Sequence, residues 1–111
     1  YLDIINIINK TSIDGLIVTN TSNNLKLKSS LNIGSLEGGL SGKVLRNSSN
    51  NILRLVKEKL NDEKIIVAVG GVFDVDSYNE KIEMGADLVQ MYTGLVYEGP
   101  NQVRRIVKNG R

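Results

Sequence analysis

Small and hydroxylic residues follow two apolar runs in the second half of the sequence. Ile65–Val69 is followed by Gly70-Gly71, and Leu88–Met91 is followed by Tyr92, Thr93 and Gly94. Short runs rich in branched apolar residues are typical of buried parallel strands, and about one helix's worth of residues separates these two. In a barrel of alternating strands and helices, such turns lie at the carboxyl ends of the strands, where backbone N–H groups bind phosphate. The spacing therefore predicts a phosphate site at these two turns.

Each turn also has a simpler interpretation. Gly70-Gly71 can be a tight connection between a strand and a helix, and the Thr93 hydroxyl can cap the helix that follows it. The pattern leaves two positions open for Tyr92, in the core or over a ligand.

A second polar cluster follows an earlier apolar run. Leu16–Val18 ends in Thr19-Asn20-Thr21, and polar side chains at the end of a buried strand need hydrogen-bond partners. They can cap the loop through Asx- or ST-type bonds, or they can contact a ligand. Further along, Gly38-Gly39 and Ser41-Gly42 permit positive φ and a close approach of the backbone to a ligand, although a flexible hinge would use the same residues.

The amino-acid composition excludes several kinds of functional site. The chain has 111 residues, a net charge of +2, and neither cysteine nor histidine. This excludes a disulfide framework, a thiolate metal site and a cysteine nucleophile, and it removes the commonest general base and metal ligand. The charge is too small to indicate nucleic acid as a partner, and no apolar run approaches the ~20 residues of a membrane span.

The elements that would position these residues alternate between helix and strand. We predict helices over 2–9, from Asn47 or Ser48 to about residue 60, from an Asp74 N-cap to near Met84, and from Gly99-Pro100 onward. Gly85 suits the left-handed residue just past the end of the third of these helices. We predict strands over 16–18, 65–69 and 88–91, and a long loop over 22–42. The predicted inward residues are Ile52, Leu53, Leu55, Val56 and Leu60 in the second helix, and Val103, Ile106 and Val107 in the last. The charged residues of the last helix, Arg104, Arg105 and Lys108, are predicted to point outward.

This order predicts a parallel α/β architecture. Three parallel strands alone would leave two exposed edges, so we expect the carboxyl-terminal part, about three βα units, of a (β/α)₈ or TIM barrel. Tyr1 begins directly in a helical segment and Arg111 ends another, and we therefore expect residues 1–111 to be a piece of one longer barrel domain.

The motifs taken together resemble one family. Asp14–Thr21, Gly38–Lys43, Val69–Val72 and Leu88–Leu95 with Gly99-Pro100 are similar, in order and spacing, to the carboxyl-terminal third of dihydroorotate dehydrogenase. The similarity is to the quinone-dependent, membrane-associated class 2, and it extends over essentially the whole chain.

The resemblance implies an FMN-containing barrel that oxidises (S)-dihydroorotate to orotate in pyrimidine biosynthesis. Transferred by position, it makes Asn20 and Thr21 substrate-binding residues. The residues that it implies for FMN binding are Thr19, Ser41, Gly42, Gly70, Gly71, Tyr92 and Thr93. It also implies that the catalytic serine, the flavin-contacting lysine and the quinone tunnel precede Tyr1. We thus expect no catalytic residue and no metal ligand here, and an isolated chain that is inactive and binds flavin poorly.

The resemblance further implies a quinone acceptor and membrane association through a segment outside this sequence. We expect the mitochondrial inner membrane in a eukaryote or the cytoplasmic membrane in a bacterium. Three alternatives stay open: a class 1 dihydroorotate dehydrogenase, a domain of the dihydropyrimidine dehydrogenase type, and a non-catalytic half-barrel.

Overall fold

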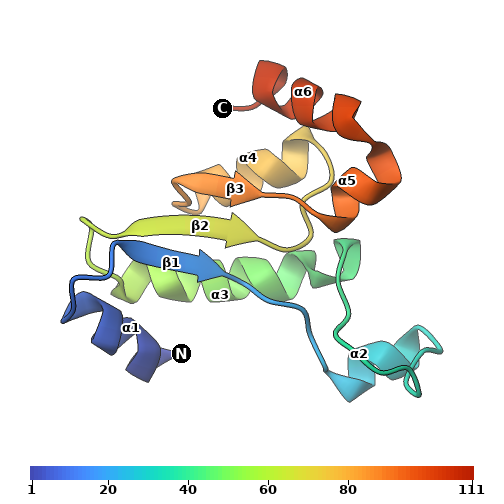
Figure 1. Ribbon diagram of the computed structural model, residues 1–111, viewed down its shortest axis with the longest axis horizontal. Helices are drawn as coiled ribbons and strands as arrows, with labels where there is room; N and C mark the ends of the chain where they lie inside the picture. Colours follow the sequence, from blue (N-terminus) through green and yellow to red (C-terminus); the bar gives the residue numbers. More distant parts are fainter.

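The computed structural model describes residues 1–111 and consists of three strands with helices between them (Figure 1). The strands are β1 (Gly15–Val18), β2 (Ile65–Val69) and β3 (Leu88–Gln90). The helices are α1 (Leu2–Asn9), α2 (Leu25–Ser30), the 3₁₀ turn η1 (Lys43–Leu45), α3 (Arg46–Lys59), α4 (Val75–Glu83), α5 (Thr93–Glu98) and α6 (Pro100–Asn109). None of these helices is both long enough and apolar enough to span a membrane.

The strands form one parallel sheet in the order β1-β2-β3. Val18 pairs with Ala68, and Val69 pairs with Gln90. All three carboxyl ends therefore lie at the same edge of the sheet. The prediction of parallel strands joined by helices is confirmed.

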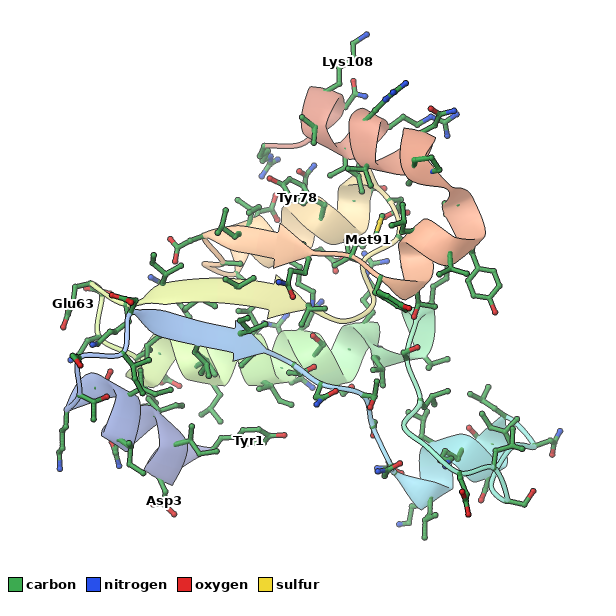
Figure 2. All side chains as sticks on the ribbon, in the orientation of Figure 1. Tyr1, Asp3, Glu63, Tyr78, Met91 and Lys108 are labelled. Carbon is green, nitrogen blue, oxygen red and sulfur yellow. The ribbon has the colours of Figure 1, made fainter.

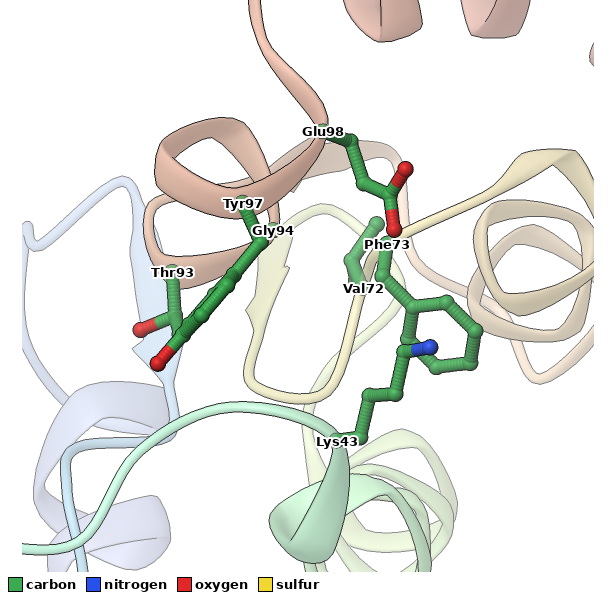
Figure 3. Close-up of a pocket in the computed structure, with 7 residues that line it drawn as sticks. All are labelled: Lys43, Val72, Phe73, Thr93, Gly94, Tyr97 and Glu98. Carbon is green, nitrogen blue, oxygen red and sulfur yellow. The ribbon is translucent and has the colours of Figure 1, made fainter.

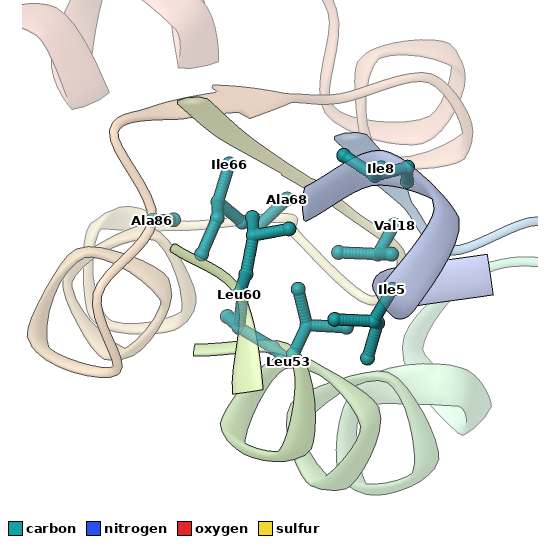
Figure 4. Packing of buried hydrophobic residues seen from close by; sticks show 9 residues of the cluster. Ile5, Ile8, Val18, Leu53, Leu60, Ile66, Ala68 and Ala86 are labelled. Atoms are coloured by element: carbon teal, nitrogen blue, oxygen red, sulfur yellow. The ribbon is translucent and has the colours of Figure 1, made fainter. Parts of the chain in front are cut away.

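One face of the sheet is covered by helices. Ile66 and Ala68 of β2 and Val18 of β1 are buried, and they pack with Ile5, Ile8 and Leu53 from α1 and α3 (Figure 4). The predicted inward stripe of α3 holds for Leu53, Val56 and Leu60, which are buried, whereas Ile52 and Leu55 are half-buried. Removal of these side chains from water is the main stabilising term for this layer.

The opposite face of the sheet is open. Side chains alternate along a strand, so Ile17 and Leu88 point away from the helices, and each is 59% exposed. Branched apolar residues on the face without helices are expected of barrel strands, because that face lines the barrel interior. Both β1 and β3 are edge strands in this sheet.

Two predicted boundaries differ from the structure. The segment 22–42 contains α2, whose N-cap Asn24 accepts a hydrogen bond from the Leu27 amide, and Ser22 forms an antiparallel bridge with Leu40. In Figure 1, α2 lies away from the sheet. Helix α3 begins at Arg46 without a side-chain cap, earlier than the predicted Asn47 or Ser48, because η1 leads directly into it.

The inward face of α6 also differs from the prediction. Ile106 is buried, but Val103 is 40% exposed and Val107 is 79% exposed. The Gln102 amide Nε2 donates to the Phe73 carbonyl at 2.9 Å, so Gln102 and Ile106, one turn apart, form the side that packs. The outward orientation predicted for the charged residues holds, and Lys108 points away from the molecule (Figure 2).

The predicted N-cap of α4 is present as a capping box. The Asp74 carboxylate accepts from the Ser77 amide at 2.8 Å, and the Ser77 hydroxyl oxygen accepts from the amides of Phe73 and Asp74 at 3.0 and 3.1 Å. At the other end, Gly85 follows the C-cap with φ +100, as predicted. The turn after β2 is thereby fixed to the first turn of α4.

Loss of this cap should lower stability measurably. We expect Asp74→Ala to reduce the free energy of unfolding by about 1 kcal/mol, because the Ser77 amide loses its acceptor and the Ser77 hydroxyl loses its 2.7 Å bond to the same carboxylate. Urea unfolding of the complete protein measures it, with Asp62→Ala as the control, because the Asp62 side chain is 98% exposed and its Lys57 contact is 3.9 Å long. Equal losses in the two variants would contradict a capping role.

Candidate functional site

A cleft lies at the carboxyl ends of the strands. It encloses about 250 Å³ and is lined by residues from all three strand ends and from the segment that precedes η1. All the residues that the resemblance implies for substrate or FMN binding line it, namely Thr19, Asn20, Thr21, Ser41, Gly42, Gly70, Gly71, Tyr92 and Thr93. Gly38 and Gly39, which the sequence also suggested for a close approach to a ligand, do not line it. Positions separated by more than 70 residues in the chain thus meet at one site.

Sheet pairing explains why these segments converge. The Thr19 amide donates to the Val69 carbonyl at 2.9 Å, so the ladder between β1 and β2 extends one residue into the polar segment. The peptide bond between Val18 and Thr19 is cis. Beyond this point the strands separate, and Thr19, Gly70 and Met91 line the same cleft.

The turn after β2 requires its glycines. Gly70 and Gly71 have φ values of +116° and +72°, which L-residues with a side chain rarely adopt. A Cβ atom at Gly71 would lie 2.5 Å from Arg46 Cα and 2.6 Å from Arg46 N. The start of α3 therefore approaches this turn so closely that only glycine fits.

The two hydroxyl-bearing segments are joined across the cleft. Ser41 Oγ and Thr93 Oγ1 lie 2.7 Å apart, although the residues are 52 positions apart in the sequence. Helix α5 has no side-chain cap, so the suggestion that Thr93 caps the following helix is wrong. A Cβ atom at Gly42 (φ +94°) would lie 3.2 Å from Thr93 Cγ2. Because glycine has no side chain, Thr93 has room to approach Ser41.

Asn20 and Thr21 lie at the rim beside β1. The Asn20 carboxamide oxygen accepts from the Thr21 amide at 2.7 Å. This bond is local, but it goes to the next residue and not to the amide two residues on that an Asx turn uses. That bond uses the oxygen, and the Nδ2 donors of the same side chain remain for another group. Tyr92 is 78% exposed, so the core position that the sequence left open for it is wrong.

The lining of the cleft contains no ionisable acid or base except the Tyr92 phenol. The nearby charged groups Arg46 and Glu80 do not line the cleft and lie on the far side of the Gly70-Gly71 turn. Arg46 is bound to Glu80 as a two-point ion pair, and Asn50 Nδ2 also donates to Glu80 at 3.0 Å. The hydrogen bond from Arg46 lowers the pKa of Glu80, and the same bond raises the pKa of Arg46. This pair therefore stays ionised and mutually neutralised next to Gly71.

Sequence reasoning missed Ser49 and Lys81, which lie behind the same turn. Ser49 Oγ donates to the Val69 carbonyl at 2.9 Å and accepts from Lys81 Nζ at 2.7 Å. Both side chains are buried, and Lys81 is fully so. No local pattern marks them, since a lysine within a polar helix is normally on the solvated face.

A second pocket adjoins the cleft through Val72, Thr93 and Gly94 (Figure 3). It encloses about 340 Å³, and its other lining residues are Lys43, Phe73, Tyr97 and Glu98. The Lys43 ammonium lies 4.3 Å from the centre of the Phe73 ring, a cation–π distance. None of these four was expected at the site.

Comparison with known proteins gives a consistent assignment. Residues 2–109 match the sequence model of the family described as dihydroorotate dehydrogenase. A relative from Bartonella tribocorum named dihydroorotate dehydrogenase (quinone) is 43% identical over 106 residues, which are 96% of this chain and 29% of the relative. A relative of the same name from Aliivibrio salmonicida is 42% identical over 100 residues, 90% of this chain and 30% of the relative. The chain thus spans about 30% of the length of these relatives.

Solved structures agree with the sequence relatives. The crystal structure of DHODH in complex with ferulenol from Eimeria tenella superposes with a TM-score of 0.86 at 33% identity, over 96% of this chain and 28% of that protein. The ligand-free DHODH from the same organism gives a TM-score of 0.85. The predicted fold class, part of a (β/α)₈ barrel, is therefore confirmed. By sequence and by structure, this chain belongs to the dihydroorotate dehydrogenase family.

Proposed function

We propose that this chain supplies flavin and substrate contacts to a quinone-dependent dihydroorotate dehydrogenase. The observation that carries the proposal is the convergence of Thr19–Thr21, Ser41-Gly42, Gly70-Gly71 and Tyr92-Thr93 in one cleft at the strand ends. In this proposal, residues 1–111 are the carboxyl-terminal part of a single barrel domain. The reaction is the oxidation of (S)-dihydroorotate to orotate in pyrimidine biosynthesis.

The residues of the cleft fit the phosphate end of FMN. Glycines with positive φ at positions 42, 70 and 71 leave the backbone uncovered, so its N–H groups are accessible to a phosphate oxygen. The hydroxyls of Thr19, Ser41 and Thr93 add neutral donors. In our assignment Gly70, Gly71, Tyr92 and Thr93 hold the phosphate, and Thr19, Ser41 and Gly42 line the rest of the flavin site.

Asn20 and Thr21 would orient the pyrimidine ring. A carboxamide and a hydroxyl match the carbonyl, N–H and carboxylate groups of dihydroorotate. Bound FMN supplies the acceptor for the hydride in such an enzyme, and the residues here contribute orientation and electrostatics. We assign no general base within this chain, and we propose that the isolated chain is inactive.

The proposed partners follow from the names of the relatives. Both sequence relatives above are bacterial proteins named for a quinone, and we propose a ubiquinone-type acceptor with membrane association through another part of the complete protein. The corresponding location would be the cytoplasmic membrane in a bacterium or the mitochondrial inner membrane in a eukaryote.

Anaerobic flavin reduction tests the proposed function. We expect the complete protein to contain bound flavin whose visible absorption band is lost on addition of dihydroorotate and restored by a quinone. Fumarate or a nicotinamide cofactor should not restore it.

Each other result corresponds to one alternative. Reoxidation by fumarate or a nicotinamide cofactor would indicate the class 1 enzyme, and flavin that dihydroorotate does not reduce would indicate another FMN barrel such as the dihydropyrimidine dehydrogenase type. A complete protein that takes up no flavin would leave the non-catalytic half-barrel.

A further inference from the structure

Lys81 is a buried cation without a carboxylate partner. Its side chain is 0% exposed, and its single hydrogen bond is to the neutral Ser49 hydroxyl at 2.7 Å. Burial of an ammonium group is costly unless an opposite charge compensates it. Glu80, the neighbouring residue on α4, is hydrogen-bonded to Arg46 and Asn50 instead.

The ammonium group lies behind the Gly70-Gly71 turn. Ser49 connects the two, because its hydroxyl accepts from Lys81 and donates to the carbonyl of Val69, the residue before the turn. A Cβ atom at Gly70 would lie 3.0 Å from Ser49 Oγ and 3.4 Å from Thr19 Oγ1. Ser49 Oγ and the cleft residue Thr19 thus both lie close to the Gly70 position of the turn.

The cleft itself offers no compensating charge for an anion. Its lining residues include no lysine and no arginine, and Arg46 next to Gly71 is already neutralised by Glu80. Lys43 points over the Phe73 ring in the adjoining pocket. Of the three cations near the turn, Arg46 is paired and Lys43 is exposed, whereas Lys81 is fully buried and has no ion-pair partner.

We infer that Lys81 is a positioning residue for the phosphate-binding turn: acting through Ser49, its buried ammonium group holds the Gly70-Gly71 backbone and provides the positive charge that a bound phosphate neutralises. The inference rests on the proposed function, because it takes the phosphate of FMN as the anion. Lys81 does not touch the ligand. Its charge acts through protein, where electrostatic interactions are screened far less than in water.

The titration of Lys81 gives the inference a pH signature. Burial lowers its pKa to about 8, with Glu80 on its own helix opposing the shift and Arg46 of α3 adding to it. Strands β2 and β3 contain no ionisable residues, and the charged residues of α6, Arg104, Arg105 and Lys108, are exposed. A phosphate bound at the turn favours the charged lysine and raises this pKa, so binding takes up protons and affinity falls as pH rises above 8.

A comparison of FMN with riboflavin, which has no phosphate, isolates this effect. We expect Lys81→Met in the complete protein to weaken FMN binding roughly tenfold at pH 7.5 and to leave riboflavin binding unchanged. The preference of the wild type for FMN over riboflavin should fall between pH 8 and pH 10, whereas that of Lys81→Met should be flat. The phosphate is already fully ionised in this range, since its second pKa is about 6. Lys59→Met, which removes an exposed lysine at the far end of α3, should match the wild type.

Several results would overturn the inference. If Lys81→Met weakens the binding of FMN and riboflavin equally, Lys81 is only a structural residue. If Lys81→Met weakens the binding of neither ligand, Lys81 has no link to the phosphate. If Lys81→Met does not fold, a pH-independent FMN preference in the wild type would overturn it. A protein that binds FMN but is not reduced by dihydroorotate contradicts the proposed substrate and leaves this test intact, whereas one that binds no flavin contradicts both.

Discussion

Replacement of Asn20 by alanine in the complete protein is expected to lower kcat/KM for dihydroorotate roughly 100-fold, with the flavin content unchanged. A loss of about 2–3 kcal/mol is the usual cost of removing hydrogen bonds that orient a reacting group in a closed site. Asn20 lies two residues beyond the end of β1 and lines the cleft, and its oxygen accepts from the Thr21 amide at 2.7 Å. This bond fixes the side chain, and Nδ2 is left to donate to a carbonyl or carboxylate of the substrate.

A second substitution separates substrate binding from loop capping. Asn20→Asp keeps an oxygen for the Thr21 amide but replaces the Nδ2 donors with an acceptor. If Asn20 contacts substrate, Asn20→Asp should be at least as impaired as Asn20→Ala, whereas a residue that only caps the loop should tolerate aspartate. Asn23→Ala is the matched control, because Asn23 is an exposed asparagine three residues further along that does not line the cleft. Unchanged steady-state kinetics in Asn20→Ala would remove Asn20 from the site.

Substitution of Gly71 by alanine is expected to abolish most flavin binding and to lower the free energy of unfolding by about 3 kcal/mol. The φ of +72° costs an L-residue about 1–2 kcal/mol, and the added Cβ would lie 2.5–2.8 Å from atoms of Arg46. Arg46 is the first residue of α3 and is bound to Glu80, so relief of the overlap requires movement of the turn that we assign to the phosphate.

Gly99→Ala provides the control for backbone strain alone. Gly99 has a similar φ of +77°, but no atom lies within 4 Å of its Cβ position. Its ψ of 174° places it in a region that glycine alone usually adopts, so we expect about 1–3 kcal/mol of destabilisation and normal flavin content in this variant. Flavin absorption after gel filtration and urea unfolding measure both quantities. Equal flavin content in Gly71→Ala and Gly99→Ala would show that the close approach to Arg46 does not matter for the site.

Much of the fold could be predicted from the sequence because its signals are local. Branched apolar runs predicted β2 and β3, the Asp74 side chain predicted the start of α4, and Gly85 predicted its end. Glycine and hydroxylic residues at the strand ends predicted which positions meet, since parallel strands bring their carboxyl ends to one edge. The residues that follow the three strands, among them Thr19, Gly70 and Thr93, do line one cleft.

Other features depended on contacts that no local pattern encodes. Helix α2 was not predicted, because it has few apolar residues and lies within the 22–42 segment, which is rich in loop-forming residues. On α6, the side that packs includes Gln102, which donates to the Phe73 carbonyl. The pairing of Ser41 with Thr93 joins segments 52 residues apart.

The sequence by itself determined the parallel α/β class and the polar residues at the strand ends, because periodicity, capping and turn chemistry act over a few neighbouring residues. The resemblance of its motifs to known proteins indicated the family. Only the tertiary structure decided the role of Lys81. Its burial results from the packing of α4 against α3 and β3, and Ser49, the residue that connects it to the turn, is 32 positions earlier in the chain. Burial and long-range partners follow from how the layers assemble, and a lysine in a polar helix carries no local sign of either.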